Sequence, residues 1–383
     1  MKSCNEKLKM AADWTNLNIF HSRPTERVRS FGRVGLSFCT LIFLFSIPLM
    51  ASAHEVYVLP AETVSENVSS TSFNMFATMT DNFSQFVFWG FIAFVVLSTI
   101  FFISVFHFFE KRLDPVFARL KGFAPVVARV AAGLGFVAAG YHQAIFGPEL
   151  PFAESFGPYA HFVSLIFVIV GTLIVVGFWA RAAAALALVV FGISLYQHGL
   201  YMLTYLGYLG EIIVLLLIGS HRVSVHSLMG WHERFHSLYH RFTDRLKPLA
   251  FPILRICFGV SLIYSSLYAK VLHNNLALQV ASLPLAGHEY SLAYYFGFEP
   301  QFLVLGAAII EIIIGLFFVF GIAIRWNSIF LLFWLSLSLW YFGESVWPHI
   351  VLIGIPIAFI MHGYDKYSLE GFYLKKGRRE PVL

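Results

Sequence analysis

Charged residues are scarce in this sequence of 383 amino acids. Only 12% of the residues are Asp, Glu, Lys or Arg, whereas 58% are hydrophobic and the mean hydropathy is +0.74. Soluble globular domains carry about 25% charged residues. The composition therefore excludes a soluble protein and predicts a chain with many membrane-spanning helices in a lipid bilayer. The formal charge of +5 does not indicate a nucleic-acid partner, because much of it lies in the first 53 residues.

Cysteine is also rare and occurs at three positions, Cys4, Cys39 and Cys257. The first two precede a candidate cleavage site and the third lies in an apolar run. The sequence therefore contains neither a disulfide framework nor a C-x-x-C redox pair, and this excludes thiol–disulfide exchange as the activity.

The N-terminus has the pattern of a secretory signal. A polar leader with Arg27, Arg29 and Arg33 precedes the apolar run 34–49, and a small-residue A-x-A site ends at Ala53. We predict a signal peptide over residues 1–53; an uncleaved anchor helix is the alternative. Cleavage would make His54 the first residue of a short exported segment, 54–83.

Apolar runs of about 20 residues predict nine membrane spans in the mature chain. They cover residues 84–108, 124–146, 160–179, 182–201, 204–219, 249–271, 300–322, 326–343 and 349–364. Basic residues follow every second span, which places all basic loops on one side, the cytoplasmic one. We expect a multi-pass protein of a bacterial inner membrane, with the mature N-terminus outside and the C-terminus in the cytoplasm.

An internal repeat organises these spans. The segment 311–325, EIIIGLFFVFGIAIR, has two glycines and an arginine whose spacing recurs 144 positions earlier in FVIVGTLIVVGFWAR. The acid Glu311 does not recur, since Phe167 stands in its place. We predict an all-α integral membrane protein with two tandem four-helix bundles, 124–220 and 249–365, oriented alike as parallel repeats.

The remaining segments connect or flank these bundles. Residues 84–123 should form one extra transmembrane helix and a cytoplasmic loop. Residues 221–248 should form a basic amphipathic linker in the cytoplasmic headgroup layer, and residues 366–383 a basic cytoplasmic tail.

The second unit resembles the DoxX family of four-span membrane proteins. The resemblance rests on R-x3-G in one helix, a lysine near its end and E-x3-G-x5-G-x3-R in the next, namely Arg255, Gly259, Lys270, Glu311, Gly315, Gly321 and Arg325. The first unit is similar to a degenerate copy, with Ala144 for Lys270 and Phe167 for Glu311. The resemblance implies a bundle related to the membrane subunit of thiosulfate:quinone oxidoreductase and to the methylamine-utilisation protein MauE.

Two acids lie inside predicted spans, where ionisation costs several kcal/mol without a partner. Glu311 lies about halfway along its span, and its candidate partners are Arg255 and Lys270. Glu211, in span 204–219, is a further candidate partner across the bundle. We interpret these four residues as candidate catalytic groups that transfer protons beside a quinone; a buried clamp that holds the bundle together is the alternative.

Histidines form a second group of candidate site residues, because several lie at the predicted outer ends of the spans. They are His54, His142, His161, His198, His273 and His349. An N-terminal histidine offers an amine and a ring nitrogen to one metal ion, and Met75 and Met79 would add the soft ligands that copper accepts. The alternative is that these rings hydrogen-bond loop carbonyls.

Three functions are compatible with these patterns. The first is a quinone-linked redox subunit that works with a partner redox subunit. The second is an outer-face protein that handles or transports copper or a similar metal. The third is a non-catalytic scaffold or assembly factor, for which the loss of the acid in the first unit is expected.

Overall fold

The computed structural model divides into two units, Met1–Ile47 and Pro48–Leu383. The structure describes residues 61–81, 86–220, 245–284, 299–342 and 347–374, with isolated positions between them, all in the second unit. The predicted signal peptide, His54 and most of the predicted linker 221–248 lie outside the described residues.

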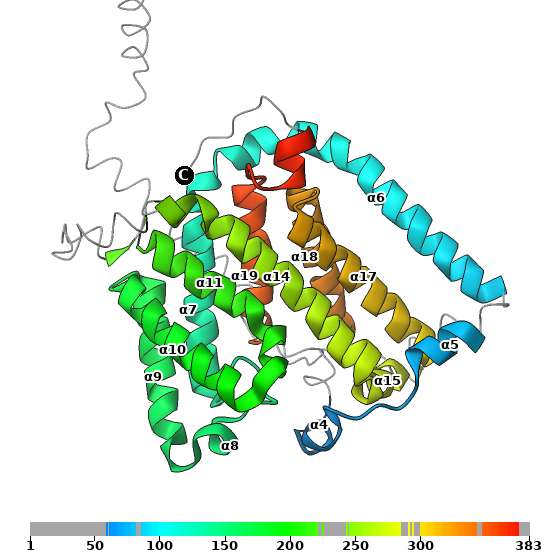
Figure 1. Ribbon diagram of the computed structural model, residues 1–383, viewed down its shortest axis with the longest axis horizontal. Coiled ribbons are helices and arrows are strands. Elements are labelled where there is room, and N and C mark those ends of the chain that lie inside the picture. Colours follow the sequence, from blue (N-terminus) through cyan, green and yellow to red (C-terminus); the bar gives the residue numbers. More distant parts are fainter. Residues whose placement is uncertain are drawn as a thin grey trace, which may run out of the picture. The chain divides into compact units, whose positions relative to one another are not determined.

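The described part of the chain is helical and contains no strand, only the isolated bridges Ala144–Pro151 and Pro284–Ser291 (Figure 1). It begins with α4 (Ala61–Asn67), α5 (Met75–Asp81) and the long α6 (Phe86–Ala118). The elements of the first predicted unit then follow. They are η1 (Lys121–Phe123), α7 (Ala124–His142), α8 (Phe152–Phe156), η2 (Gly157–Tyr159), α9 (Ala160–Val176), α10 (Ala180–His198), η3 (Gly199–Tyr205) and α11 (Leu206–Ile218).

The elements of the second predicted unit come next. They are η4 (Lys247–Leu249), α14 (Ala250–Ser266), the π-helix η5 (Leu267–Leu272), α15 (Asn275–Ser282), α17 (Pro300–Phe320), α18 (Ile324–Phe342), α19 (His349–His362) and the π-helix η6 (Glu370–Leu374). Each predicted span therefore contains a helix in the described residues.

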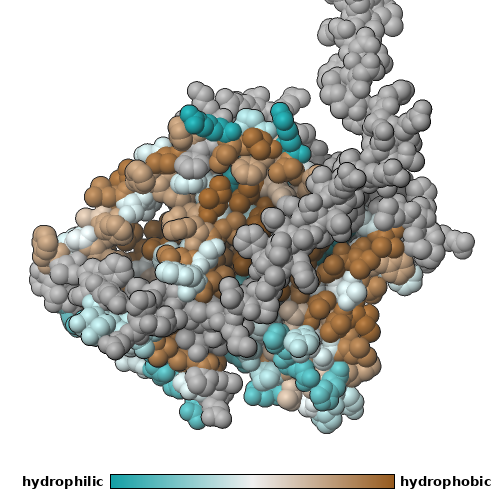
Figure 2. All heavy atoms as spheres, turned by 180° about the vertical axis from the view of Figure 1, so that it is seen from behind, coloured by the Kyte–Doolittle hydropathy of each residue, from teal (hydrophilic) through white to brown (hydrophobic). Residues whose placement is uncertain are grey.

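Six helical stretches among the described residues are long and apolar enough to cross a membrane. They are Trp89–Phe106, Lys121–His142, Phe152–Val176, Ala180–Ile218, Lys247–Leu272 and Pro300–Phe320, and two shorter apolar helices span Ile324–Trp340 and His349–His362. Figure 2 shows hydrophobic side chains gathered over the middle of one face, with hydrophilic ones towards its upper and lower edges. The prediction of an all-α, multi-pass membrane protein is confirmed.

Within each half, glycines bring two helix backbones into contact. A Cβ on Gly259 of α14 would lie 2.6 Å from the carbonyl oxygen of Gly315 on α17, and one on Gly133 of α7 would lie 2.8 Å from that of Gly171 on α9. Contacts this close exclude any side chain, so the glycines of the motif serve helix packing, as small residues commonly do in membranes.

The two halves pack through their first and last helices. α11 lies against α14, and α19 lies against α7. A Cβ on Gly210 would lie 3.1 Å from the Cβ of Cys257, and one on Gly354 would touch Ala131. The last helix of each half therefore packs on the first helix of the other.

Helix α6 and the C-terminal segment differ from the sequence-based expectation. α6 continues to Ala118, through charged residues that we placed in a loop after residue 108. Residues 364–374 fold back onto the bundle, with Ser368 and Glu370 at 1% and 4% exposure, where we expected a tail from residue 366. Both differences arise because acids in these segments bind arginines of the bundle, as described below.

The glycine contact between α14 and α17 can be tested by adding one methyl group. We expect Gly259→Ala to lower the free energy of unfolding by about 1–3 kcal/mol, because overpacking a tight helix interface forces the backbones apart. Gly192→Ala in α10 is the matched control, since nothing lies within 4 Å of the position that the new Cβ would occupy. Thermal denaturation in detergent measures both variants, and equal melting temperatures would contradict the packing role.

Candidate functional site

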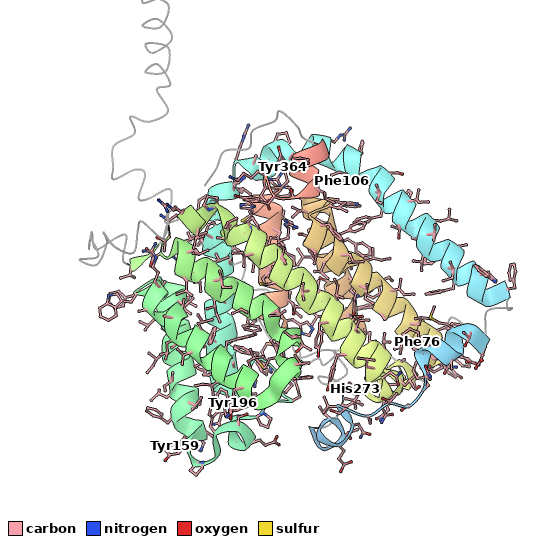
Figure 3. The ribbon with its side chains drawn as sticks, in the orientation of Figure 1. Phe76, Phe106, Tyr159, Tyr196, His273 and Tyr364 are labelled. Carbon is pink, nitrogen blue, oxygen red and sulfur yellow. The ribbon has the colours of Figure 1, made fainter. Side chains whose placement is uncertain are left out.

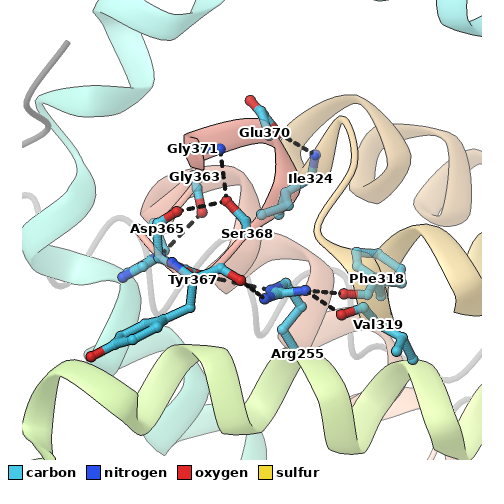
Figure 4. Close-up of polar contacts among 11 residues, drawn as sticks. Arg255, Phe318, Val319, Ile324, Gly363, Asp365, Tyr367, Ser368, Glu370 and Gly371 are labelled. Carbon is cyan, nitrogen blue, oxygen red and sulfur yellow. Dashed lines mark hydrogen bonds and ion pairs between the residues drawn. The ribbon is translucent and has the colours of Figure 1, made fainter. Parts of the chain in front are cut away.

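The buried Arg255 of α14 caps the end of α17. Its Nη1 donates hydrogen bonds to the carbonyl oxygens of Phe318 and Val319, at 2.7 Å for Val319 (Figure 4). These carbonyls belong to the last turn of α17, where backbone acceptors have no helical partner. Gly321 ends this helix with φ +68°, and a Cβ there would lie 2.8 Å from Arg255 Nη1. Glycine is required at this position because it adopts a positive φ without strain and because a side chain would collide with the Arg255 guanidinium.

Acids of the C-terminal segment complete this arrangement. Asp365 Oδ2 lies 3.6 Å from Arg255 Nε. Ser368 Oγ donates to the carbonyl of Asp365 at 2.6 Å, and Glu370 Oε2 accepts from the backbone N–H of Ile324 at 3.0 Å, at the start of α18. Sequence reasoning missed Asp365 and Glu370. The signal available was that Asp365 directly follows the last predicted span and Glu370 interrupts the stretch assigned to a basic tail.

Arg325, the last residue of the motif, is held in the same manner. It donates through Nη1 to Asp114 Oδ1 of α6 at 2.6 Å and through Nε to the carbonyl of Ile360 on α19 at 2.8 Å. Next to it, Gly363 adopts φ +74°. Arg325 thus connects α6, α18 and α19, and Asp114 is a partner that the sequence analysis did not identify.

The first half contains the same combination of arginine and left-handed glycine. Gly177 has φ +71° and its Cβ would lie 2.8 Å from Arg129 Nη1; Gly219 has φ +67° and its Cβ would lie 2.8 Å from Arg181 Nε. The four motif arginines therefore lie against helix-ending glycines.

Of the two candidate partners of Glu311, Arg255 and Lys270, the structure pairs it with Lys270. Lys270 Nζ donates to Glu311 Oε2 at 2.9 Å, and the two side chains are 9% and 15% exposed. Arg255 is occupied at the other end of α17, as described above. Lys270 lies in η5, where α14 ends as a π-helix; such irregular turns are frequent at functional sites. An acid and an amine in an apolar bundle can exchange a proton, so this pair is the candidate site.

Residues 61–81, which we predicted to be exported, pack next to the end of η5 that leads into α15. Asn274, which follows η5, is fully buried, accepts from the N–H of Ser72 at 3.1 Å and donates to the carbonyl of Phe73 at 2.9 Å. Met75 is 2% exposed and packs with Ala277 and Leu305 in an apolar cluster. Figure 3 shows His273 at the same end of the helices, and Tyr364 at the opposite end. Residues 61–81 therefore cover part of the end that carries Lys270.

The predicted metal ligands have other contacts. His142 stacks on Trp347 with ring centroids 4.8 Å apart, and His198 Nε2 lies 3.1 Å from Ser155 Oγ. His161 is exposed and His349 is buried at the start of α19. Among the described residues no group of three or more His, Cys, Asp or Glu could hold a metal ion. His54 lies outside them, and Met75 belongs to the apolar cluster.

Glu211 does not pair with Glu311. Its side chain is fully buried in α11, and neither carboxylate oxygen has a hydrogen-bond partner within the described ranges. The structure thus separates the four predicted catalytic residues into a capping arginine, an ion pair and an acid buried alone.

The buried ion pair gives a stability prediction. Lys270→Met should lower the free energy of unfolding by about 3–5 kcal/mol, because it leaves the Glu311 carboxylate buried without its cation. The double variant Lys270→Met/Glu311→Leu should recover most of this loss, since both charges are gone. Lys366→Met is the control, because this lysine is exposed. Chemical denaturation in mild detergent measures all three; a double variant no better than the single one would refute the pairing.

Comparison with known proteins finds one family. Residues 250–344 match the DoxX family. No curated protein and no solved structure matches the chain. The matched segment contains Arg255, Lys270, Glu311 and Arg325, so the domain includes both the arginine caps and the ion pair. The chain is thus a multi-pass membrane protein that carries a DoxX domain over residues 250–344.

Proposed function

We propose that this protein is a quinone-linked redox subunit of a membrane, in which the Lys270–Glu311 pair exchanges protons with the quinone. The observation that carries the proposal is a largely buried ion pair, 2.9 Å long, inside the DoxX domain. The corresponding positions of the first half hold Ala144 and Phe167, both buried. The same packing is therefore achieved there without charges, which supports a role other than packing for the pair.

Polar side chains in and directly after the π-helix that carries Lys270 offer contacts for a quinone headgroup. His273 Nδ1 is buried and has no hydrogen-bond partner in the described part of the chain, and the His273 ring lies 4.4 Å from that of Tyr268. These two side chains and Lys270 offer donors for quinone carbonyl oxygens. Leu267 and Leu272, at the ends of the same π-helix, are 38% and 55% exposed, so an isoprenoid tail could reach the site from the lipid.

In this proposal the Lys270–Glu311 pair supplies protons to the reduced quinone, and its two opposite charges offset each other. A bound quinone would accept electrons and protons together on reduction. The Lys270 ammonium donates a proton towards the headgroup as the quinone takes up electrons, and the Glu311 carboxylate accepts the next proton and passes it to the Lys270 amine. A partner redox subunit provides the electrons, and solvent at the end covered by residues 61–81 returns the proton.

We also infer that residues 124–220 and 249–365 are two copies of one unit. Support comes from matching contacts at corresponding positions. Gly133–Gly171 and Gly259–Gly315 join the first two helices of each half, and Gly177 and Gly321 accommodate an arginine. The reciprocal packing of α11 on α14 and α19 on α7 relates the halves by a pseudo-twofold arrangement. The second copy retains the ion pair and is the active one.

The topology follows from the distribution of basic residues. We propose that residues 1–53 are a signal peptide, that nine spans cross a bacterial inner membrane, and that the end with Lys270 faces outward while the C-terminus lies in the cytoplasm.

Quinone binding tests this function. We expect Glu311→Gln and Lys270→Met to weaken the affinity of nanodisc-embedded protein for a short-chain ubiquinone analogue at least tenfold, with normal expression of Glu311→Gln. Glu299→Gln is the matched control, because Glu299 lies at the exposed start of the same helix. Quenching of the protein's intrinsic fluorescence gives the affinity.

Other outcomes point to the other functions. Equal affinity in wild type and Glu311→Gln would show that the pair is structural. Stoichiometric copper in the purified protein, lost without His142 and His273, would replace the quinone by a metal. A tightly co-purifying subunit without any response to quinone would indicate a scaffold.

A further inference from the structure

Two polar side chains are buried side by side in α11 of the first half. Glu211 is 0% exposed and Tyr208 is 4% exposed. Their spacing of i, i+3 places them on neighbouring turns of one helix face. Neither the Tyr208 hydroxyl nor the carboxylate oxygens of Glu211 have a hydrogen-bond partner among the residues that the structure describes. Buried polar groups are rarely left in this condition without a function or a ligand.

The surroundings of this pair are apolar. The Tyr208 ring packs against Phe146, with centroids 4.3 Å apart, and against Phe136 at 6.3 Å. A Cβ on Gly207, one turn before Glu211, would lie 3.3 Å from the Phe258 ring and 3.5 Å from Ile355. Among the described residues, no group of three or more His, Cys, Asp or Glu that could hold a metal ion includes Glu211. A single carboxylate in apolar surroundings can bind a proton, because the neutral acid avoids the cost of a buried charge.

Packing does not require an acid at this position. The repeat offset of 144 residues places Ile355 of α19 where Glu211 lies in α11, and Ile355 is likewise 0% exposed. A buried carboxylate costs several kcal/mol more than an isoleucine unless something offsets its charge. The fold therefore tolerates an apolar residue here, and the acid needs another explanation.

Titratable groups on the adjacent helices are engaged elsewhere. Arg255 of α14 binds the end of α17, and Arg129 of α7 lies against Gly177. His362 of α19 stacks on Phe251 at 3.9 Å. The group that faces α11 from α14 is the thiol-bearing Cys257, next to Gly210. The remaining titratable groups of these helices lie at their ends or on exposed faces.

A row of tyrosines leads from the end of the bundle to this pair. Glu149, in the loop between α7 and α8, accepts hydrogen bonds at Oε1 from Tyr201 at 3.1 Å and from Tyr205. The Tyr205 and Tyr208 rings are 6.2 Å apart. Positions 201, 205, 208 and 211 follow one another along η3 and α11, so three hydroxyls lie between the Glu149 carboxylate and that of Glu211.

We propose that Glu211 is a proton-binding site, reached from the Glu149 end through the hydroxyls of Tyr205 and Tyr208. A proton from water binds Glu149 and passes through the two hydroxyls, each of which releases one proton as it accepts another. Water molecules carry the proton across the two steps on either side of the Tyr208 hydroxyl, which has no hydrogen-bond partner among the described residues, and the Glu211 carboxylate becomes a carboxylic acid. The reverse sequence returns the proton to water, and no electrons move. This site is separate from the Lys270–Glu311 pair and does not depend on quinone binding.

Infrared spectroscopy of the full-length protein in lipid tests the site. We expect a carboxylic-acid C=O band that is present in acidic medium and disappears in alkaline medium. Glu211→Gln should remove this band, whereas Glu311→Gln should retain it. Should Glu211→Gln fold poorly, Glu211→Ile, which introduces the residue of the corresponding position, provides the same comparison. Identical pH difference spectra in wild type and both Glu211 variants would overturn the proposal.

Hydrogen–deuterium exchange of the same band tests the route. Transfer to D2O shifts the carboxylic-acid band, and Tyr205→Phe should slow this shift at least tenfold. Tyr196→Phe is the control, because its ring is 91% exposed at the end of α10. An unchanged rate in Tyr205→Phe would disprove the route, and a band that responds to NaCl at constant pH would show a metal-cation site in place of a proton site.

Discussion

The ends of the membrane helices impose the main constraint on this fold. Lipid offers no hydrogen bonds, so the last carbonyls of α17 need a donor from the protein itself. Arg255 supplies it from α14, and its own charge is balanced by Asp365, which follows α19. One guanidinium thus joins three segments. Arg325 does the same for α6, α18 and α19 through Asp114 and Ile360.

This constraint explains why the motif combines arginines with glycines. A guanidinium can reach the helix end only where the capping residue lacks a side chain and adopts a positive φ, as Gly321 does. The glycines at 259 and 315 meet a separate need, close contact of the helices that bear these groups. Most of the motif therefore describes architecture, and Lys270 and Glu311 are the motif residues left for chemistry.

The two halves have similar helix packing but differ in their buried polar residues. The second half buries Lys270 and Glu311 where the first has Ala144 and Phe167, and the first buries Glu211 where the second has Ile355. Each half thus has an ionisable group that its counterpart replaces by an apolar one. If the halves are copies, they have specialised in opposite ways.

The sequence predicted the helices well, because long apolar runs in a membrane permit little else. Apart from α6, which continues past residue 108 to Ala118, helix positions agreed within a few residues, and the repeat spacing indicated which glycines and arginines correspond. It could not decide between Arg255 and Lys270 as the partner of Glu311, because that depends on which way side chains point at each depth. The roles of Asp114 and Asp365 were hidden for another reason: their partners lie far away in the chain, and both acids stood in segments assigned to loops.

The contacts of residues 61–81 have a consequence for biogenesis. Asn67 accepts a hydrogen bond from Asn275, and Ser70 accepts one from the backbone of the same residue, about 200 positions later in the chain. During synthesis from the N-terminus, this segment emerges long before its binding surface exists. Its docking therefore has to wait until α14 and α15 have been synthesised, which makes this contact one of the last to form during assembly.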